Sequence, residues 1–131
     1  MSIEIPFWDK PVETLDRKEI EELQLIGLKK QIEHALNTSF YSKRFKEYKI
    51  LGTEDFKTLS DIRRLPFTTK NDLREAYPFG MLCVSKEDLV RIHASSGTTG
   101  TPTIIYHNKK DLDMASDTMA RSLVAAGCKK G

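Results

Sequence analysis

One short run of this sequence gathers the side chains and backbone groups that could hold an anion. It consists of small hydroxyl residues, glycines and one proline, without a large apolar side chain: Ser95-Ser96-Gly97-Thr98-Thr99-Gly100-Thr101-Pro102-Thr103. Glycine allows positive φ angles and close approach of the backbone to a ligand, so successive N–H groups can point into one concavity while neighbouring hydroxyls add donors. The run therefore predicts a loop suited to a polyphosphate.

Two alternative interpretations of the run are weaker. A flexible linker of Ser, Thr and Gly does not usually lie between two β-prone stretches, and Pro102 restricts the backbone at one end. An ordinary P-loop, GxxxxGK[ST], counted from Gly97 would need Gly and Lys where the chain has Pro102 and Thr103. The pattern therefore does not favour a Walker-type nucleotide hydrolase.

Histidine and serine also stand close together, which raises the question of hydrolytic chemistry. His93 precedes Ser95 by two residues, but the sequence has neither a GxSxG elbow nor a fitting acidic third residue. His34 and His107 are isolated in the sequence and are interpreted as surface or packing residues. We therefore assign no catalytic residue and no metal ligand within the chain.

Hydrophobic periodicity predicts the elements that would hold the run. Residues 89–93 and 104–106 are β-prone, which places a strand on each side of the loop. Residues 16–36 have apolar side chains mostly three and four positions apart, as in an amphipathic helix. A second amphipathic helix is expected over residues 111–126, with Gly127 directly after its end.

Shorter elements are indicated by capping residues and prolines. Thr69 followed three residues later by Asp72 predicts the start of a short helix, which Pro78 ends. Ser85 with Asp88 repeats that pattern before the first strand. Residues 40–65 show only short helical pieces, such as residues 59–64.

The composition limits the classes of protein to which the chain can belong. At 131 residues it is long enough for one core, and its 39% hydrophobic and 31% charged residues are typical of a globular chain. No apolar run approaches the roughly 18 residues of a transmembrane helix, and the N-terminus lacks a secretory pattern. The net charge of +2 gives no polybasic surface. We expect a cytoplasmic protein without membrane or nucleic-acid partners.

The two cysteines, Cys83 and Cys128, stand far apart and in no metal-ligand spacing. A disulfide framework in a secreted protein normally has four or more cysteines. We therefore expect both to be reduced thiols that fill space in the structure.

Residues 95–102 resemble the phosphate-binding signature of adenylate-forming enzymes, the superfamily of acyl-CoA synthetases, nonribosomal-peptide adenylation domains and luciferases. Many members have Lys after the proline, where this chain has Thr103. In this respect the chain resembles one branch of the superfamily, the phenylacetate-CoA ligases. Three further segments resemble the same branch: residues 65–74 (LPFTTKNDLR), residues 77–80 (YPFG) and His93-Ala94 before the loop.

The resemblance implies an α/β fold, in which this chain is the N-terminal fragment of the large domain of an adenylate-forming enzyme. It would be mostly helical, with one strand-loop-strand unit. Residues 1–131 would form an incomplete N-terminal part of the AMP-binding domain, and the C-terminal domain would be absent. The chain alone would then be inactive, although the parent enzyme is a ligase.

The reaction implied by the resemblance has two steps. Phenylacetate or a related aryl acid reacts with ATP and Mg²⁺ to give an acyl-adenylate, and coenzyme A then displaces AMP. The resemblance assigns the phosphates to Ser96, Gly97, Thr98, Thr99 and Gly100, with Ser95 and Thr101 as further contacts at the two ends. Thr103 stays unassigned, because it stands where other branches have a cation.

Two expectations concern partners. Amphipathic helices and strand edges that a larger domain would cover should favour self-association or pairing with the missing remainder. An alternative of a different class is a non-catalytic assembly or interaction module that retains the loop. Heat released on titration with ATP or pyrophosphate would separate the two.

Overall fold

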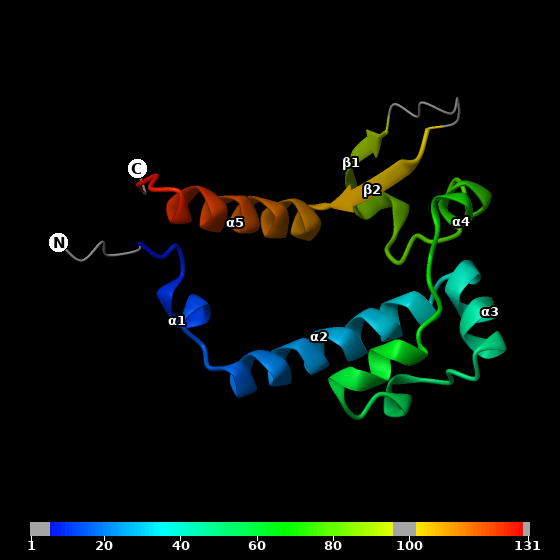
Figure 1. Ribbon diagram of the computed structural model, residues 1–131. Helices are drawn as coiled ribbons and strands as arrows, with labels where there is room; N and C mark the ends of the chain where they lie inside the picture. Colours follow the sequence, from blue (N-terminus) through cyan, green and yellow to red (C-terminus); the bar gives the residue numbers. More distant parts are fainter. Residues whose placement is uncertain (1–5, 96–101, 130–131) are drawn as a thin grey trace.

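A computed structural model describes residues 6–95 and 102–129 of the chain (Figure 1). The described part is mostly helical and contains one two-stranded antiparallel sheet, as the sequence predicts. The helices are α1 (Lys10–Glu13), α2 (Arg17–Leu36), α3 (Ser39–Glu47), α4 (Lys70–Glu75) and α5 (Lys109–Ala125). The strands are β1 (Leu89–Ala94) and β2 (Ile104–Asn108), and short 3-10 turns cover Thr53–Asp55, Leu59–Arg64 and Lys86–Asp88.

The start of α2 is fixed by a reciprocal cap. The Glu19 backbone N–H donates to the Asp16 carboxylate at 2.8 Å, and the Asp16 backbone N–H donates to the Glu19 carboxylate at 2.9 Å. Two N–H groups that the helix itself cannot satisfy are thereby paired. The helix ends at Leu36, which confirms the predicted element.

The core is small and lies at one end of α2. Ile32 from α2, Phe45 from α3, and Ile50 and Phe56 from the following loop are all nearly inaccessible to solvent. The sequence predicts only short helical pieces after residue 40, whereas the structure has the nine-residue α3. Its N-cap is Thr38, whose hydroxyl accepts from the Tyr41 N–H at 3.1 Å. This helix brings Phe45 into the core.

The sheet is a hairpin with a defined register. Ile92 is opposite Tyr106, and Ala94 is opposite Ile104, with an irregularity between Leu89 and Arg91. The two strands are therefore antiparallel, as expected for segments joined by one loop. In Figure 1 the hairpin and α5 form the upper part of the molecule, and α2 and α3 form the lower part.

The last helix begins two residues earlier than the sequence predicts. Asn108 is its N-cap: the Asp111 N–H donates to the Asn108 side chain, and the Asn108 N–H donates to the Asp111 carboxylate, both at 2.9 Å. The helix ends before Gly127, whose φ of +100° is a left-handed conformation that favours glycine. The predicted role of Gly127 is confirmed.

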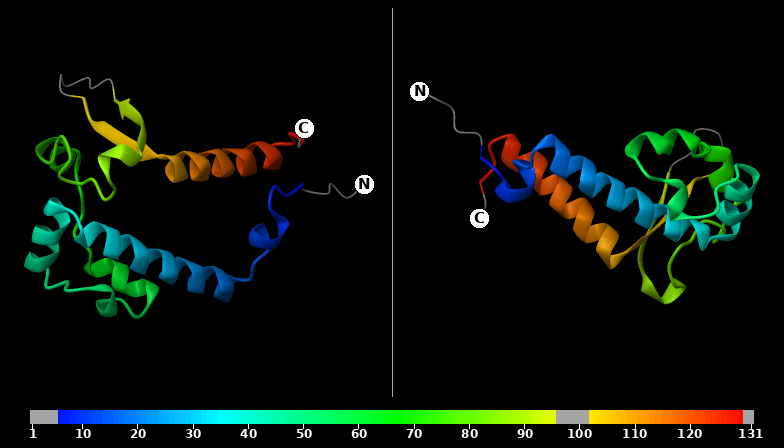
Figure 2. Two further views of the ribbon diagram at one scale, coloured as in Figure 1. Left: turned by 180° about the vertical axis from the view of Figure 1, so that it is seen from behind. Right: turned by 90° about the horizontal axis from the view of Figure 1, so that it is seen from below.

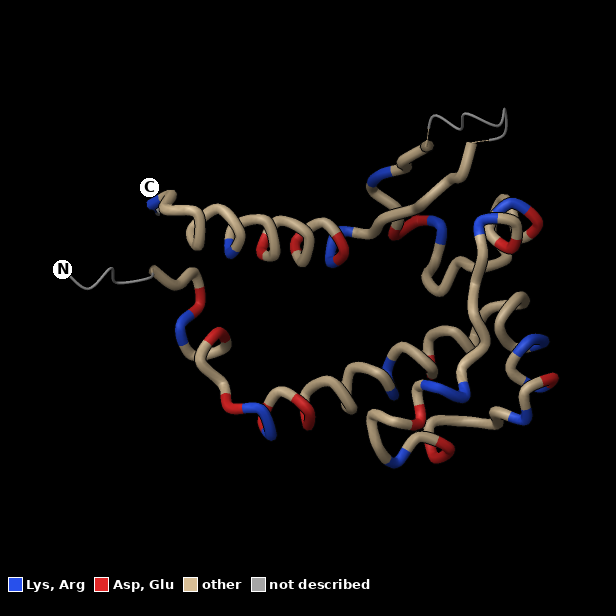
Figure 3. The backbone as a smooth tube through the Cα atoms, in the orientation of Figure 1, with Lys and Arg blue, Asp and Glu red and all other residues tan. Residues whose placement is uncertain are grey.

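The first and last helices meet at one end of the molecule (Figures 1 and 2). The segment with Trp8 and Asp9 contacts Asp117 and Arg121 of α5. Basic and acidic positions are interspersed along the chain (Figure 3). None of the helices in the described part is both long and apolar enough to cross a membrane.

Several apolar side chains of the two long helices face solvent. Leu23 and Ile26 of α2 are 55% and 65% exposed, and Met114 and Met119 of α5 are also exposed. The expected amphipathic faces are thus only partly buried. Burial needs a packing partner; the main cluster of buried residues lies at the C-terminal end of α2, and in α5 Val124 is buried outside that cluster.

The interpretation of the cysteines as space-filling residues is wrong. Cys83 and Cys128 are free thiols, and both are exposed. Cys83 follows the turns after α4, and Cys128 follows the end of α5, so both lie in surface connections and not in the core. The expectation that they are unpaired is confirmed.

Candidate functional site

Ser95 and Thr103, at the two ends of the candidate run, are hydrogen-bonded to each other. The Ser95 N–H donates to the Thr103 carbonyl at 3.0 Å, and the Thr103 N–H donates to Ser95 Oγ at 3.1 Å. These bonds extend the ladder beyond the Ala94 and Ile104 pair. The two ends of the run are therefore held together at the tip of the hairpin.

Six of the seven residues assigned to phosphate binding lie outside the described residues: Ser96, Gly97, Thr98, Thr99, Gly100 and Thr101. Ser95 is the described member of the set, and it is exposed. Its oxygen accepts from the Thr103 N–H, which leaves the hydroxyl proton available for an acceptor. Ser95 can thus close the hairpin and donate to a ligand at the same time.

Thr103 is the residue at this place that sequence reasoning left unassigned. Its side chain is only 6% exposed, and its Oγ1 has no hydrogen-bond partner among the residues that the structure describes. A threonine at the end of a polar run, directly before the strand, carries no sequence signal of burial. The burial of Thr103 depends on the pairing of the two strand ends, which joins residues eight positions apart.

The histidines of the hairpin are neighbours in space. The ring centroids of His93 and His107 are 4.9 Å apart, with the rings at 68°. In the register His93 is opposite Ile105 and Arg91 is opposite His107, so the two rings project from the same face of the sheet. His107, isolated in the sequence, thus has a neighbour in space, because strand pairing joins residues distant in sequence.

The two rings are not part of a larger ligand set. Within the described ranges, no group of three or more His, Cys, Asp or Glu residues could hold a metal ion. The pair is a packing contact between strands, in keeping with the packing role expected for His107.

The YPFG segment, residues 77–80, lies against the hairpin. The Phe79 and Tyr106 ring centroids are 5.4 Å apart. Beside this contact, Leu73, Tyr77 and Met81 line a small cavity of about 180 Å³ with Ile104 and Tyr106 of β2. The segment therefore supports the strand that follows the loop.

Within residues 65–74, Thr69 and Asp72 form the hydrogen-bonded cap at the start of α4. The Thr69 N–H and hydroxyl both donate to one Asp72 carboxylate oxygen, at 2.6 and 2.8 Å, and Arg44 lies 3.0 Å from the same oxygen. The Asp72 residue is 8% exposed. The charge-assisted hydrogen bond from Arg44, followed by the Thr69 bonds, lowers the pKa of Asp72 to about 2.

The Arg44 contact joins two helices. Its guanidinium pairs with Asp72 at the start of α4, donates to the Phe67 carbonyl at 3.2 Å, and lies over the Phe40 ring. Tyr41 adds a hydroxyl contact of 2.7 Å to Thr68. These bonds fix the connection from α3 to α4 and, through it, the YPFG segment that supports β2.

Comparison with known proteins gives one consistent result. No protein-family model matches the chain. Curated proteins named phenylacetate-coenzyme A ligase are similar to it: the protein of Aromatoleum evansii is 43% identical over 123 residues, and that of Escherichia coli (strain K12) is 45% identical over 118 residues. These matches cover 93% and 89% of this chain.

A third similar protein, from Thermus thermophilus, has the same name and is 40% identical over 120 residues. The matched region is 28% of the Aromatoleum protein and 27% of the other two. The chain therefore spans little more than a quarter of the length of these relatives.

Proposed function

Because this chain belongs to the phenylacetate-CoA ligase family and spans little more than a quarter of the length of its relatives, we propose that it is part of an acid–thiol ligase. The proposed substrates are phenylacetate or a related aryl acid, MgATP and coenzyme A. The observation that carries the proposal is the 40–45% identity over about nine tenths of the chain. In this proposal residues 1–131 are the first part of an AMP-binding domain, and the C-terminal domain lies outside the chain.

The proposed reaction has two steps with different leaving groups. In the first, a carboxylate oxygen attacks the α-phosphorus of ATP, the bond to the β-phosphate oxygen breaks, and pyrophosphate leaves. In the second, the thiol of coenzyme A attacks the acyl carbon, AMP leaves, and the thiol proton passes to solvent. Catalysis of such transfers depends mainly on positioning and on neutralising charge.

The proposed task of this chain is to hold the β- and γ-phosphates. Ser96, Gly97, Thr98, Thr99 and Gly100 are proposed as direct contacts, with Ser95 and Thr101 at the ends. The hydrogen bonds between Ser95 and Thr103 support this assignment, because they hold both ends of the loop at one point. Magnesium enters with the nucleotide as part of the substrate.

A second candidate function is a non-catalytic assembly module. It is favoured by the exposed apolar side chains on the hairpin, where Ile92 is 62% and Ile105 is 50% exposed. A two-stranded sheet also has two edges on which another strand can pair. This alternative requires no ligand at the loop.

Isothermal titration of the 131-residue chain with magnesium pyrophosphate and with MgATP tests the proposal. The ligase proposal predicts binding of both, with competition between them for one site. Sodium sulfate serves as the control for unspecific anion binding. The absence of heat with both phosphate ligands would reject the proposal and favour the assembly module.

A further inference from the structure

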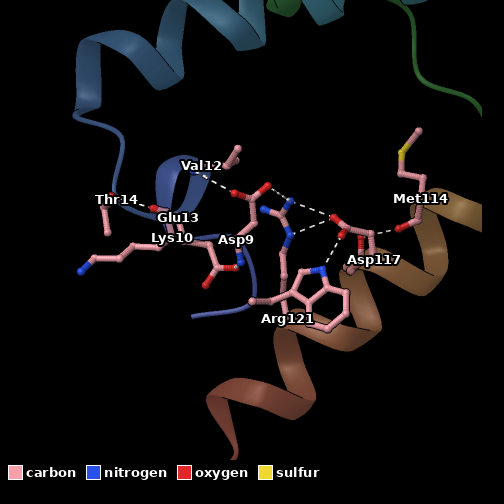
Figure 4. Close-up of polar contacts among 10 residues, drawn as sticks. Asp9, Lys10, Val12, Glu13, Thr14, Met114, Asp117 and Arg121 are labelled. Atoms are coloured by element: carbon pink, nitrogen blue, oxygen red, sulfur yellow. Dashed lines mark hydrogen bonds and ion pairs between the residues drawn. The ribbon is translucent and has the colours of Figure 1, made fainter. Parts of the chain in front are cut away.

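Helix α5 has two sides of different character. On one side Asp117 and Arg121 bond to the N-terminal segment (Figure 4), and Val124 is only 6% exposed. Met119 stands two positions from both Asp117 and Arg121, which is a rotation of about 200° around the helix, so it lies on the opposite side. Met119 is 60% exposed, and Leu123, one turn further, is 49% exposed. The opposite side of α5 is therefore apolar and open to solvent within the described part of the chain.

This side of α5, called the outer strip below, contains no charged residue. All its members are apolar or small: Leu112, Ala115, Ser116, Met119, Ala120, Ser122 and Leu123. The strip advances from residue 112 to residue 123 in steps of four, three and four positions, as do the seams along which helices pack. Beside its first turn, Lys109 and Asp113 pair with each other. The centres of packed interfaces are likewise depleted of charge and enriched in methionine.

The relief of the outer strip fits a helix. Met119 separates two shallow grooves, one lined by Ser122 and the other by Ser116 and Ala120. Helices pack by inserting the side-chain ridge of one into the groove of the other, with their axes about 8–10 Å apart. Small residues on both sides of a large one permit this close approach. The surface therefore suits a second helix.

The length of the relatives supplies a source for such a helix. The matched region is 28% of the Aromatoleum protein and 27% of the Escherichia coli protein, so most of each relative lies outside the part that corresponds to this chain. Proteins rarely leave a large apolar patch exposed. We propose that a helix from that remaining part of the polypeptide packs lengthwise on the outer strip of α5 in the complete ligase. This inference rests on the proposed function and adds the partner of this surface.

A second copy of the chain is the competing occupant of the outer strip. A segment of the same polypeptide meets the strip at an effective concentration of about millimolar, whereas a copy must associate from dilute solution. The intramolecular helix therefore occupies the strip first in the complete ligase. Contact between copies through Met119 is then a property of the isolated chain.

The reactivity of introduced cysteines tests the proposal in the complete ligase and in the 131-residue chain. Met119→Cys lies in the outer strip, and Asp113→Cys is the matched control on the same helix. After brief treatment with N-ethylmaleimide, peptide mass spectrometry separates the new thiols from the exposed Cys83 and Cys128.

In the isolated chain, diluted until light scattering detects monomer, the thiols at positions 119 and 113 should react at similar rates. In the complete ligase, position 119 should react at least roughly tenfold more slowly, because the covering helix must first open locally. The reactivity at position 113 should change by less than about threefold, because this residue lies beside the strip.

A packing variant gives an independent measurement. Ala115→Leu enlarges a small residue of the outer strip, and Ala125→Leu makes the same change on the other side of the helix. In the isolated chain both should change the melting temperature little, since both alanines are exposed. In the complete ligase Ala115→Leu should lower it by several degrees, because an enlarged side chain overpacks a close helix contact. Ala125→Leu should not.

The outcomes separate this inference from the proposed function. If the complete ligase protects position 119 but forms no acyl-CoA, the proposed function fails and the inference stands. If it forms acyl-CoA while position 119 reacts as fast as in the isolated chain, only the inference is overturned. Protection that disappears when the complete ligase is diluted would assign the strip to a second copy, which also overturns the inference. Equal melting shifts for Ala115→Leu and Ala125→Leu would reject the close helix contact.

Discussion

The indole N–H of Trp8 donates a hydrogen bond of 2.6 Å to Asp117 Oδ1, although the residues are 109 positions apart in the sequence. Arg121 Nε donates to the other oxygen of Asp117 at 3.0 Å and lies near Asp9 (Figure 4). These contacts attach the segment before α1 to α5. They place a stabilising link far from the core around Phe56.

Replacing Trp8 by Phe should lower the free energy of unfolding by about 1 kcal/mol, because one partly buried hydrogen bond is lost. Urea denaturation followed by circular dichroism measures the change. The control is Asp113→Asn on the same helix, which removes an exposed ion pair with Lys109 and should cost at most about 0.5 kcal/mol. Equal losses in the free energy of unfolding of the two variants would show that the Trp8 hydrogen bond does not stabilise the contact with α5.

The stability of the protein should depend on Asp72 in acid. Its pKa in the folded state is lowered from 3.8 to about 2, so the ionised form stabilises the fold above pH 4, and this contribution is lost as the pH falls towards 2. The parent should therefore be more stable than Asp72→Asn at neutral pH, with a difference that narrows between about pH 4 and 2. Thermal unfolding at several pH values measures it.

Arg44→Met provides the matched variant for the acid experiment, because it removes the partner that lowers the pKa of Asp72 most. Its stability difference from the parent should narrow over the same pH interval. A difference that stays constant from neutral pH to pH 2 would contradict the role given to this ion pair.

Two glycine substitutions should have opposite effects. Gly27→Ala lies inside α2 with nothing within 4 Å of the added carbon, and should stabilise the protein by up to about 1 kcal/mol. Gly127→Ala also meets no neighbour, but its φ of +100° should cost about 1 kcal/mol. Parallel urea denaturation measures the change in the free energy of unfolding of each variant. Stabilisation by Gly127→Ala would contradict the assignment of Gly127 as the residue that ends α5.

If Thr98 contacts the phosphates, Thr98→Val in the complete enzyme should slow phenylacetate-dependent pyrophosphate exchange by roughly ten- to a hundredfold. The melting temperature should change little, since the expected contact is to the ligand. The control is Thr118→Val, a substitution of an exposed threonine of α5. An unchanged exchange rate together with a strongly lowered melting temperature would indicate a structural role for Thr98.

The 131-residue chain alone should form no detectable acyl-CoA and should associate. Catalysis needs groups on several sides of the nucleotide, and the proposed site here supplies the phosphate contacts. The exposed Leu23, Ile26 and Met119 favour contact between copies. Light scattering should detect dimers or larger species, and Ile26→Glu should shift them towards monomer. A uniform monomer, or thioester formation by the pure chain, would refute the prediction.

The sequence by itself determined the elements whose ends depend on near neighbours. The caps formed by Asp16 with Glu19 and by Thr69 with Asp72 join residues three positions apart, and Gly127 ends α5 through its own backbone freedom. The strands on both sides of the loop follow from alternation and β-propensity. Such interactions are local, so the order of residues specifies them.

Only the tertiary structure decided which side chains are buried and which distant residues meet. Ile26 and Ile32 are both apolar residues of α2, yet Ile32 is in the core and Ile26 faces solvent, because α3 and the loop with Phe56 pack against one end of the helix. The Thr103 hydroxyl, the contact between His93 and His107, and the bond from Trp8 to Asp117 likewise require chain segments to come together in space. Burial and long-range contacts depend on packing, which no periodicity along the chain encodes.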